Sequence, residues 1–145
     1  MHLHKKMILA LTLSSLSAMT FAASLPLSPQ IIAHRGGTAD APENTVPAIK
    51  LALENKADAV WITVQLSRDG IPVLYRPSDL SSLTQEKGAV SHYTAKELAQ
   101  MDAGWAFGTA TDHPYRDKHI GIPQLDTVLK TFPTTTFYID IKTPD

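Results

Sequence analysis

The sequence predicts an α/β fold in which strands pair in parallel and helices cross between them. Apolar segments typical of strands are interleaved with segments whose apolar residues recur every three or four positions, as in helices. Their order along the chain is strand, helix, strand, strand, helix, helix, strand. This alternation favours a parallel sheet with helical crossovers.

The first predicted strand, residues 30–35, is a short apolar run that leads into His34-Arg35-Gly36-Gly37. This tetrapeptide brings a titratable imidazole, a fixed cation and a flexible backbone to one point. Pro42-Glu43-Asn44-Thr45 then introduces a helix over residues 46–55, and Asn44 or Thr45 can cap its first turn. The combination is typical of a phosphate site at the mouth of a β/α unit.

The next strand, residues 59–67, alternates strictly and therefore has two distinct faces. Arg68-Asp69-Gly70 is a turn signal that separates it from a short strand over residues 72–76. Thr94 and Glu97 match a capping box. The remaining predicted elements are helices over 95–101 and 123–131 and a strand over 135–142, with loops at 79–93 and 105–121.

Residues 1–22 have the features of a secretory signal peptide, with two lysines, then an apolar and hydroxyl-rich stretch, then small residues before the cleavage point. The stretch is shorter than the roughly 20 residues that span a bilayer, so we expect no stable membrane span. The absence of cysteine excludes a lipoprotein anchor and a disulfide framework. We therefore expect residues 23–145 to be exported, to the periplasm or the extracellular space.

The charge balance limits the classes of partner. The chain has 13 Lys and Arg against 14 Asp and Glu, so it has no basic field for nucleic acid or anionic lipid. The sequence carries no signal of oligomeric state.

Several motifs occur in order and together resemble the glycerophosphodiester phosphodiesterase family over residues 30–142. They are Ile31-Ile32-Ala33-His34-Arg35-Gly36, Pro42-Glu43-Asn44-Thr45, Ala57-Asp58-Ala59-Val60, Asp69-Gly70-Ile71-Pro72-Val73, residues 98–104, Ile122-Pro123-Gln124-Leu125 and Tyr138-Ile139-Asp140-Ile141-Lys142. The resemblance implies a (β/α)8 TIM barrel, which typically needs about 250 residues. We therefore expect about the first four of eight strands here, and a chain that is the N-terminal half of the domain.

The resemblance also implies a reaction, the hydrolysis of glycerophosphodiesters to glycerol 3-phosphate and an alcohol. In the family two histidines act as general acid and base, an arginine holds the phosphate, and Ca²⁺ or Mg²⁺ sits on three carboxylates. A metal and an arginine are needed because a phosphodiester is an anion that repels nucleophiles. A group that exchanges protons near neutral pH must then serve the reacting oxygens.

By position, His34 matches the first catalytic histidine, Arg35 the phosphate-binding arginine and Lys142 the lysine of the last strand, with Glu43 in support. Asp140 stands where the family has one glutamate ligand of the metal. Three other positions depart from the family. Trp61 and Thr63 replace the two other metal carboxylates, and Arg76 replaces the second histidine.

These replacements change the chemistry that the sequence predicts. One carboxylate, Asp140, binds Ca²⁺ or Mg²⁺ weakly, because these ions select clustered, mostly anionic oxygens. Arg76 is permanently charged and cannot exchange protons near neutral pH, although it can help Arg35 and Lys142 to bind an anion. The pattern predicts phosphate binding more than hydrolysis.

Structural alternatives stay open for the same residues. His34 can be a buried histidine bonded to a carbonyl, and Trp61 can be core. Arg35 with Glu43, and Asp140 with Lys142, can be ordinary ion pairs. Three functional alternatives also stay open, namely a phosphodiesterase with an altered site, a binding protein without turnover, and the product of a truncated reading frame.

Overall fold

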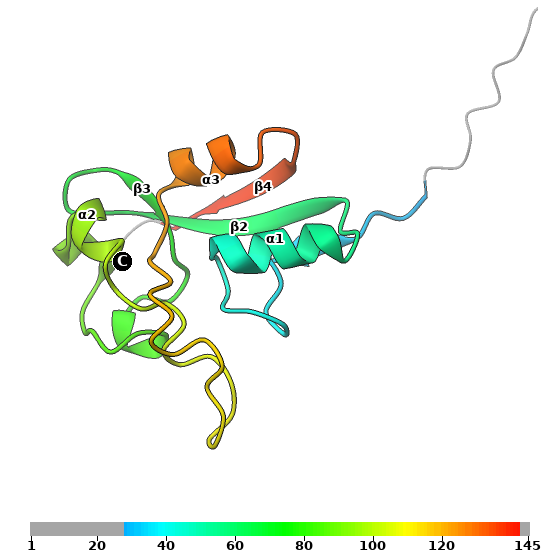
Figure 1. Cartoon of the computed structure of the whole chain (residues 1–145). Coiled ribbons are helices and arrows are strands. Elements are labelled where there is room, and N and C mark those ends of the chain that lie inside the picture. Colours follow the sequence, from blue (N-terminus) through cyan, green and yellow to red (C-terminus); the bar gives the residue numbers. More distant parts are fainter. Residues whose placement is uncertain (1–27, 143–145) are drawn as a thin grey trace, which may run out of the picture.

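A four-stranded sheet organises residues 28–142, the part of the chain that the computed structural model describes (Figure 1). Its strands are β1 (Ile32–His34), β2 (Ala59–Leu66), β3 (Pro72–Leu74) and β4 (Thr136–Ile141). The predicted signal peptide lies outside the described residues, so export stays a prediction. Within residues 28–142, no helix has the length and hydropathy needed to cross a bilayer.

β2 is the central strand and pairs with all three others. β1 and β4 run parallel to it, as predicted, whereas β3 runs antiparallel. The expectation of parallel pairing is wrong for β3, because a parallel return needs a crossover of a dozen or more residues and the turn at 67–71 is too short. β4 lies along one edge of β2 from Ala59 to Val64, which leaves the other edge to β1 and β3.

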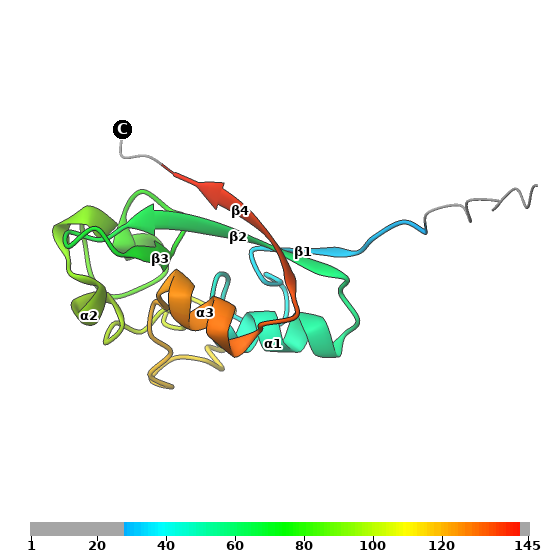
Figure 2. The ribbon, with the colours of Figure 1, turned by 90° about the horizontal axis from the view of Figure 1, so that it is seen from above.

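Two helices cover a single face of the sheet. Figure 2 shows α1 (Val46–Glu54) and α3 (Leu125–Thr131) on the same side. α1 begins after Thr45, whose hydroxyl accepts a hydrogen bond from the Ala48 N–H at 3.4 Å. The core between these helices and the sheet consists of the buried residues Ile49, Val60, Ile62, Val64, Leu74 and Val128.

α3 begins two residues later than the sequence predicts. The Pro123 carbonyl accepts a hydrogen bond from the Leu74 N–H at 2.9 Å, and Gln124 forms an isolated bridge with Val73. Residues 123 and 124 therefore continue the sheet beside β3 instead of starting the helix.

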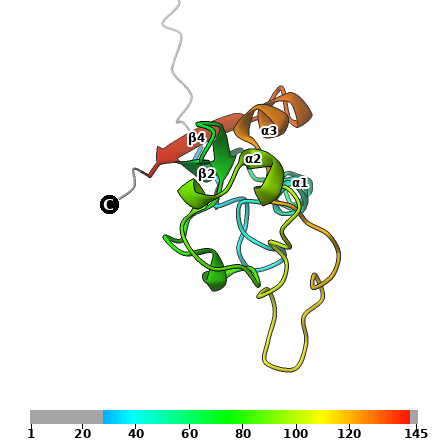
Figure 3. The ribbon, with the colours of Figure 1, turned by 90° about the vertical axis from the view of Figure 1, so that its left-hand side faces the viewer.

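The segment between β3 and α3 forms a second core together with Val73 of β3. It contains two 3₁₀ turns, η1 (Leu80–Ser82) and η2 (Val90–His92), where the sequence predicts loop, and the short helix α2 (Ala95–Leu98). The capping box of α2 is present, but the helix ends before Met101 because its last turn tightens into i to i+3 bonds. Residues 105–121 form a loop, as predicted, and this loop extends away from the sheet (Figure 3). Buried residues of this core are Val73, Tyr75, Leu80, Val90, Ala95, Leu98, Ala103 and Ile122.

The opposite side of the sheet carries the strand side chains that point away from the helices. We call it the open face and define it by His34, Trp61, Thr63, Tyr138 and Asp140. These residues alternate with Ala33, Val60, Ile62 and Phe137, which pack under the helices. Figure 2 shows no helix of the described residues over the open face.

Asp69 joins the β2–β3 turn to α2. Its Oδ1 accepts hydrogen bonds from the Ser67 hydroxyl at 2.6 Å and from the Ala95 N–H at 2.9 Å. The bond from Ser67, followed by the bond from Ala95, holds the pKa of the Asp69 carboxyl below its usual value. The ionised form of Asp69 therefore stabilises the fold more than its protonated form does.

The variant Asp69→Asn tests this linkage. Because the folded-state pKa is depressed, the stabilisation is complete above the unfolded-state value of 3.8 and is lost as pH falls through the folded-state pKa. We expect thermal melting of the variant to lie below wild type at neutral pH, and the two curves to converge as the solution becomes acidic. Asp112→Asn, at an exposed loop position, is the control. A constant gap between Asp69→Asn and wild type at all pH values would contradict the assignment.

Candidate functional site

The turn after β1 places His34 and Arg35 at the carboxyl end of that strand. Arg35, Gly36 and Gly37 have φ angles of 53°, 81° and 96°, so three successive residues are left-handed. The Gly37 N–H donates to the His34 carbonyl at 3.0 Å and closes the turn. A Cβ at Gly36 would lie 3.1 Å from Cγ1 of Ile49, so the turn needs glycine there for both space and φ.

Arg35 forms an ion pair with Glu43. Its Nη1 lies 2.8 Å from Oε2 of Glu43, with 24% and 13% of the two side chains exposed. The ion pair that the sequence left open is therefore present in the structure. A guanidinium has five N–H donors, so one bond to Glu43 leaves others available for an anion. The ion pair fixes the direction of the Arg35 side chain without using up its donors.

Asn44 connects the start of α1 to the sheet. Its N–H donates to the Arg35 carbonyl at 2.6 Å, and its Oδ1 accepts from the Thr63 N–H at 2.9 Å. Thr45, not Asn44, is therefore the residue that caps α1. Asn44 is 1% exposed and has a φ of 57°. Its Nδ2 and the Glu43 Oε1 have no hydrogen-bond partner within residues 28–142.

Strand register places the residues of the open face in rows. His34, Trp61 and Tyr138 occupy one row, and Thr63 and Asp140 occupy the next. The His34 and Trp61 rings meet edge to face, with centroids 5.3 Å apart and planes at 72°. Residues 28–142 bury neither ring: His34 is exposed and Trp61 is 42% exposed.

Asp140 and Lys142 form the second ion pair of the site. The Lys142 Nζ lies 3.0 Å from the Asp140 Oδ2, and both side chains are partly exposed. This is the ordinary ion pair that the sequence left open. The ammonium has three donors, so it can contact Asp140 and a further anion.

Arg76 follows β3 and is exposed. The preceding residue is bonded to β2, because the Tyr75 N–H donates to the Thr63 carbonyl at 3.1 Å. The side-chain amide of Gln65 in β2 donates to the carbonyls of the two residues that flank Arg76, Tyr75 and Pro77, at 2.9 Å each. β1 ends opposite Trp61 on the same edge of β2. The backbone at Arg76 therefore lies next to the end of β1.

The other nearby acids are engaged elsewhere. Asp58 Oδ2 accepts a hydrogen bond from the Ile31 N–H at 2.7 Å, and Asp69 bonds to Ser67 and Ala95. Over the described part of the chain, no three His, Asp or Glu side chains gather in a way that could hold a metal ion.

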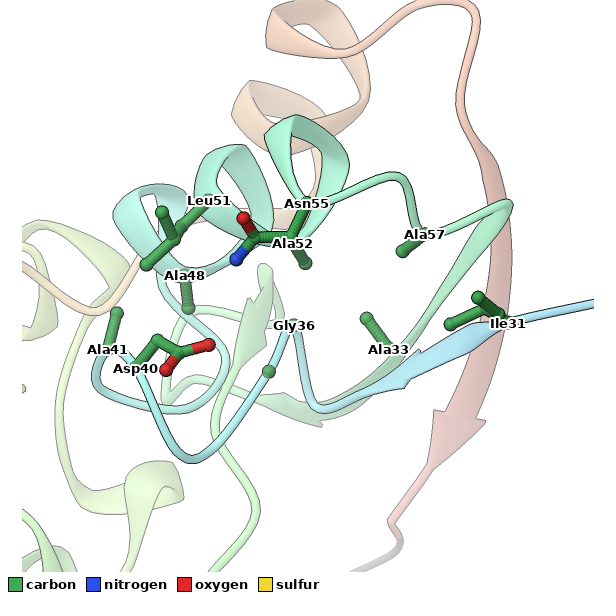
Figure 4. Close-up of a pocket in the computed structure, with 11 residues that line it drawn as sticks. Ile31, Ala33, Gly36, Asp40, Ala41, Ala48, Leu51, Ala52, Asn55 and Ala57 are labelled. Atoms are coloured by element: carbon green, nitrogen blue, oxygen red, sulfur yellow. The ribbon is translucent and has the colours of Figure 1, made fainter.

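A separate pocket lies on the helix side of β1. Figure 4 shows it between β1, α1 and the loop at residues 36–41, with Asp40 and Asn55 among mainly apolar side chains. It contains neither His34 nor Arg35. The residues that carry chemistry therefore lie away from this pocket, on the open face and at its edge.

Comparison with known proteins identifies the family. The profile of the Glycerophosphoryl diester phosphodiesterase family matches residues 34–145. This chain belongs to that family. Rv2277c of Mycobacterium tuberculosis is 48% identical over 126 residues, which cover 82% of this chain and 42% of the relative. The glycerophosphodiester phosphodiesterase of Bacillus subtilis is 31% identical and covers 99% of this chain and 54% of the relative.

Solved structures of the family share the fold. The phosphodiesterase domain of Rv2277c matches with a TM-score of 0.74 at 47% identity, over 78% of this chain and 43% of that one. A phosphodiesterase from Oleispira antarctica, in complex with the product sn-glycerol-3-phosphate, matches with a TM-score of 0.70 at 34% identity, over 79% and 44%. The predicted fold is confirmed as part of a TIM barrel, and the chain spans about half the length of these relatives or less.

The residues of this family member do not fit the family's divalent cation. Of the three positions that the resemblance assigns to metal carboxylates, 61 and 63 hold an indole and a neutral hydroxyl. The third, Asp140, is bound to Lys142. Ca²⁺ and Mg²⁺ need several oxygen ligands, most of them anionic, so this donor set is too poor.

Three contributors to the site were missed by sequence reasoning: Asn44 as a link to β2, Gln65, and Tyr138 beside Trp61. The alternation of strand residues predicts on which face of the sheet Gln65 and Tyr138 lie. The residues beside them depend on the register between strands, which the sequence does not give. Asn44 and Thr45 are both able to cap the helix, so the sequence does not show that Thr45 is the cap and that Asn44 bonds to β2.

Substitution of Asn44 tests the link. Asn44→Ala leaves the Thr63 N–H without its partner and puts an alanine in the left-handed region, so we expect a loss of about 2–4 kcal/mol in unfolding free energy. Asn44→Gly removes only the hydrogen bond and should cost about 1–3 kcal/mol. Urea unfolding measures both. Asn55→Ala, at the exposed end of α1, is the control, and losses equal to the control's would refute the role of Asn44.

Proposed function

We propose that this protein takes glycerophosphodiesters as ligands and binds them through the phosphate group. The observation that carries the proposal is the placement of His34 and Arg35 at the carboxyl end of β1, in a family member that matches a phosphodiesterase solved with sn-glycerol-3-phosphate. The glycine turn and the Glu43 ion pair hold Arg35 in place before a ligand arrives.

Each residue has a role that its chemistry suggests. The guanidinium of Arg35 suits two oxygens of a phosphate, because its donors form a planar fork. Lys142 and Arg76 add positive charge at the same end of the sheet. His34 is the side chain able to accept or donate a proton near neutral pH.

The family's reaction, hydrolysis to glycerol 3-phosphate and an alcohol, is the first candidate for the step after binding. In this reaction His34 would move a proton at an oxygen of the phosphodiester, and Arg35 would stabilise the charge on the phosphate. This activity would place the protein in glycerophosphodiester metabolism.

The second candidate is binding without turnover, and the geometry favours it. Arg76 stands in place of the second histidine and cannot exchange a proton. Trp61 and Thr63 stand in place of two metal ligands. His34 is then the one histidine among the predicted site residues, and Glu43 and Asp140 are held in ion pairs. Hydrolysis needs protons both removed from water and given to the leaving alcohol.

Binding is tested by calorimetry with sn-glycerol-3-phosphate. We expect Arg35→Ala to weaken binding about tenfold to a hundredfold, because a hydrogen bond to a charged group contributes about 1.5–3 kcal/mol. Lys130→Ala removes an exposed positive charge from α3 and is the matched control. Equal affinity for wild type and Arg35→Ala would overturn the proposed site.

Turnover is tested by release of glycerol 3-phosphate from glycerophosphocholine with added Ca²⁺ or Mg²⁺. For binding without turnover we expect no product above the uncatalysed level. Metal-dependent product that disappears in His34→Ala would instead establish the first candidate.

A further inference from the structure

The charge of the open face differs from that of a metal-binding site in a specific way. Replacing two carboxylates with Trp61 and Thr63 removes two negative charges, which equals the charge that a divalent cation would add. Among positions 61, 63 and 140, which lie in two adjacent rows of the open face, Asp140 alone is anionic. Without a cation, these three positions therefore have the same net charge as three carboxylates that hold one divalent cation.

We infer that this protein binds the phosphate group of its ligand without a divalent cation, because neutral side chains at positions 61 and 63 do electrostatically what the cation does in a fully acidic site. The inference rests on the proposed function, since it concerns the same phosphate site. It adds that this site needs no metal to accept an anion.

The ion pairs support the inference. Asp140 is neutralised by the Lys142 ammonium at 3.0 Å, and Glu43 by the Arg35 guanidinium at 2.8 Å. Both acids of the site are thus balanced within the chain. An arriving phosphate meets no uncompensated carboxylate, and Arg76 adds an exposed positive charge. In a partly exposed site, a charged side chain within a few ångströms of the phosphate measurably changes its binding affinity.

Steric occupation points the same way. The Trp61 ring contacts His34, and in its row it lies between His34 and Tyr138. A cation at this level would have to displace an indole that has no oxygen to offer. Thr63 is 2% exposed and uncharged, so it offers a cation no anionic oxygen.

The first experiment measures sn-glycerol-3-phosphate binding to the wild-type chain by calorimetry, in excess EDTA and in millimolar CaCl₂ or MgCl₂. We expect the affinities in EDTA and in CaCl₂ or MgCl₂ to agree within about twofold, because the site does not bind the cation and its charge therefore stays the same. Binding that requires Ca²⁺ or Mg²⁺ would overturn this inference and leave the proposed function intact. No binding under any condition would instead overturn the proposed function.

The second experiment restores the acids in the double variant Trp61→Glu/Thr63→Asp. We expect binding in EDTA to weaken by at least about tenfold, because two negative charges now face the phosphate. Added CaCl₂ should recover it, and calorimetry with CaCl₂ alone should detect a site that wild type lacks.

The matched control is Trp61→Gln/Thr63→Asn, which has the same side-chain shapes without the charges. We expect its binding to be independent of metal, as in wild type. Thermal melts show whether both double variants fold, and the single variant Thr63→Asp serves if the acidic pair does not. Metal dependence in the neutral pair would show that loss of Trp61 packing, and not charge, controls the site, and would refute the inference.

Discussion

The hydrogen bond from the Thr63 N–H to the Asn44 side chain fixes the position of the rest of the site. Asn44 also donates its own N–H to the Arg35 carbonyl, so one buried residue joins β1, α1 and β2. An unpaired N–H in the middle of β2 would be costly, which makes this bond hard to give up. The orientation of Arg35, and through it Glu43, depends on this connection.

Helices and strands whose apolar residues recur at regular spacing could be predicted from the sequence, and so could the family. β2 and α1 are indicated by alternation and by the Pro42–Thr45 motif, to within a residue at each end. The direction of β3 was predicted wrongly, although the short turn at 67–71 contains the information needed to correct it. The positions of α3 and α2 shifted because contacts distant in sequence, such as Leu74 with Pro123, decide where a helix begins.

The contacts between the predicted site residues could not be read from the sequence. Sequence spacing indicates that His34 and Arg35 act together, yet the edge-to-face contact of His34 with Trp61 depends on the register of β1 with β2. Trp61 illustrates the limit. Large aromatic residues are usually buried, but its exposure here depends on which face the helices cover. Burial could not be assigned until the sheet had been assembled.

The arrangement of β1 and β3 on one edge of β2 has a consequence for local opening. β2 is bonded along both edges, whereas β1 pairs with it through three residues only. Amide hydrogens of β2 should then exchange with solvent last, and those of β1 among the first. The strand that carries His34 and leads into Arg35 is thus one of the least stable parts of the sheet. A ligand held at His34 would therefore slow exchange along β1, including at backbone amides that it does not touch.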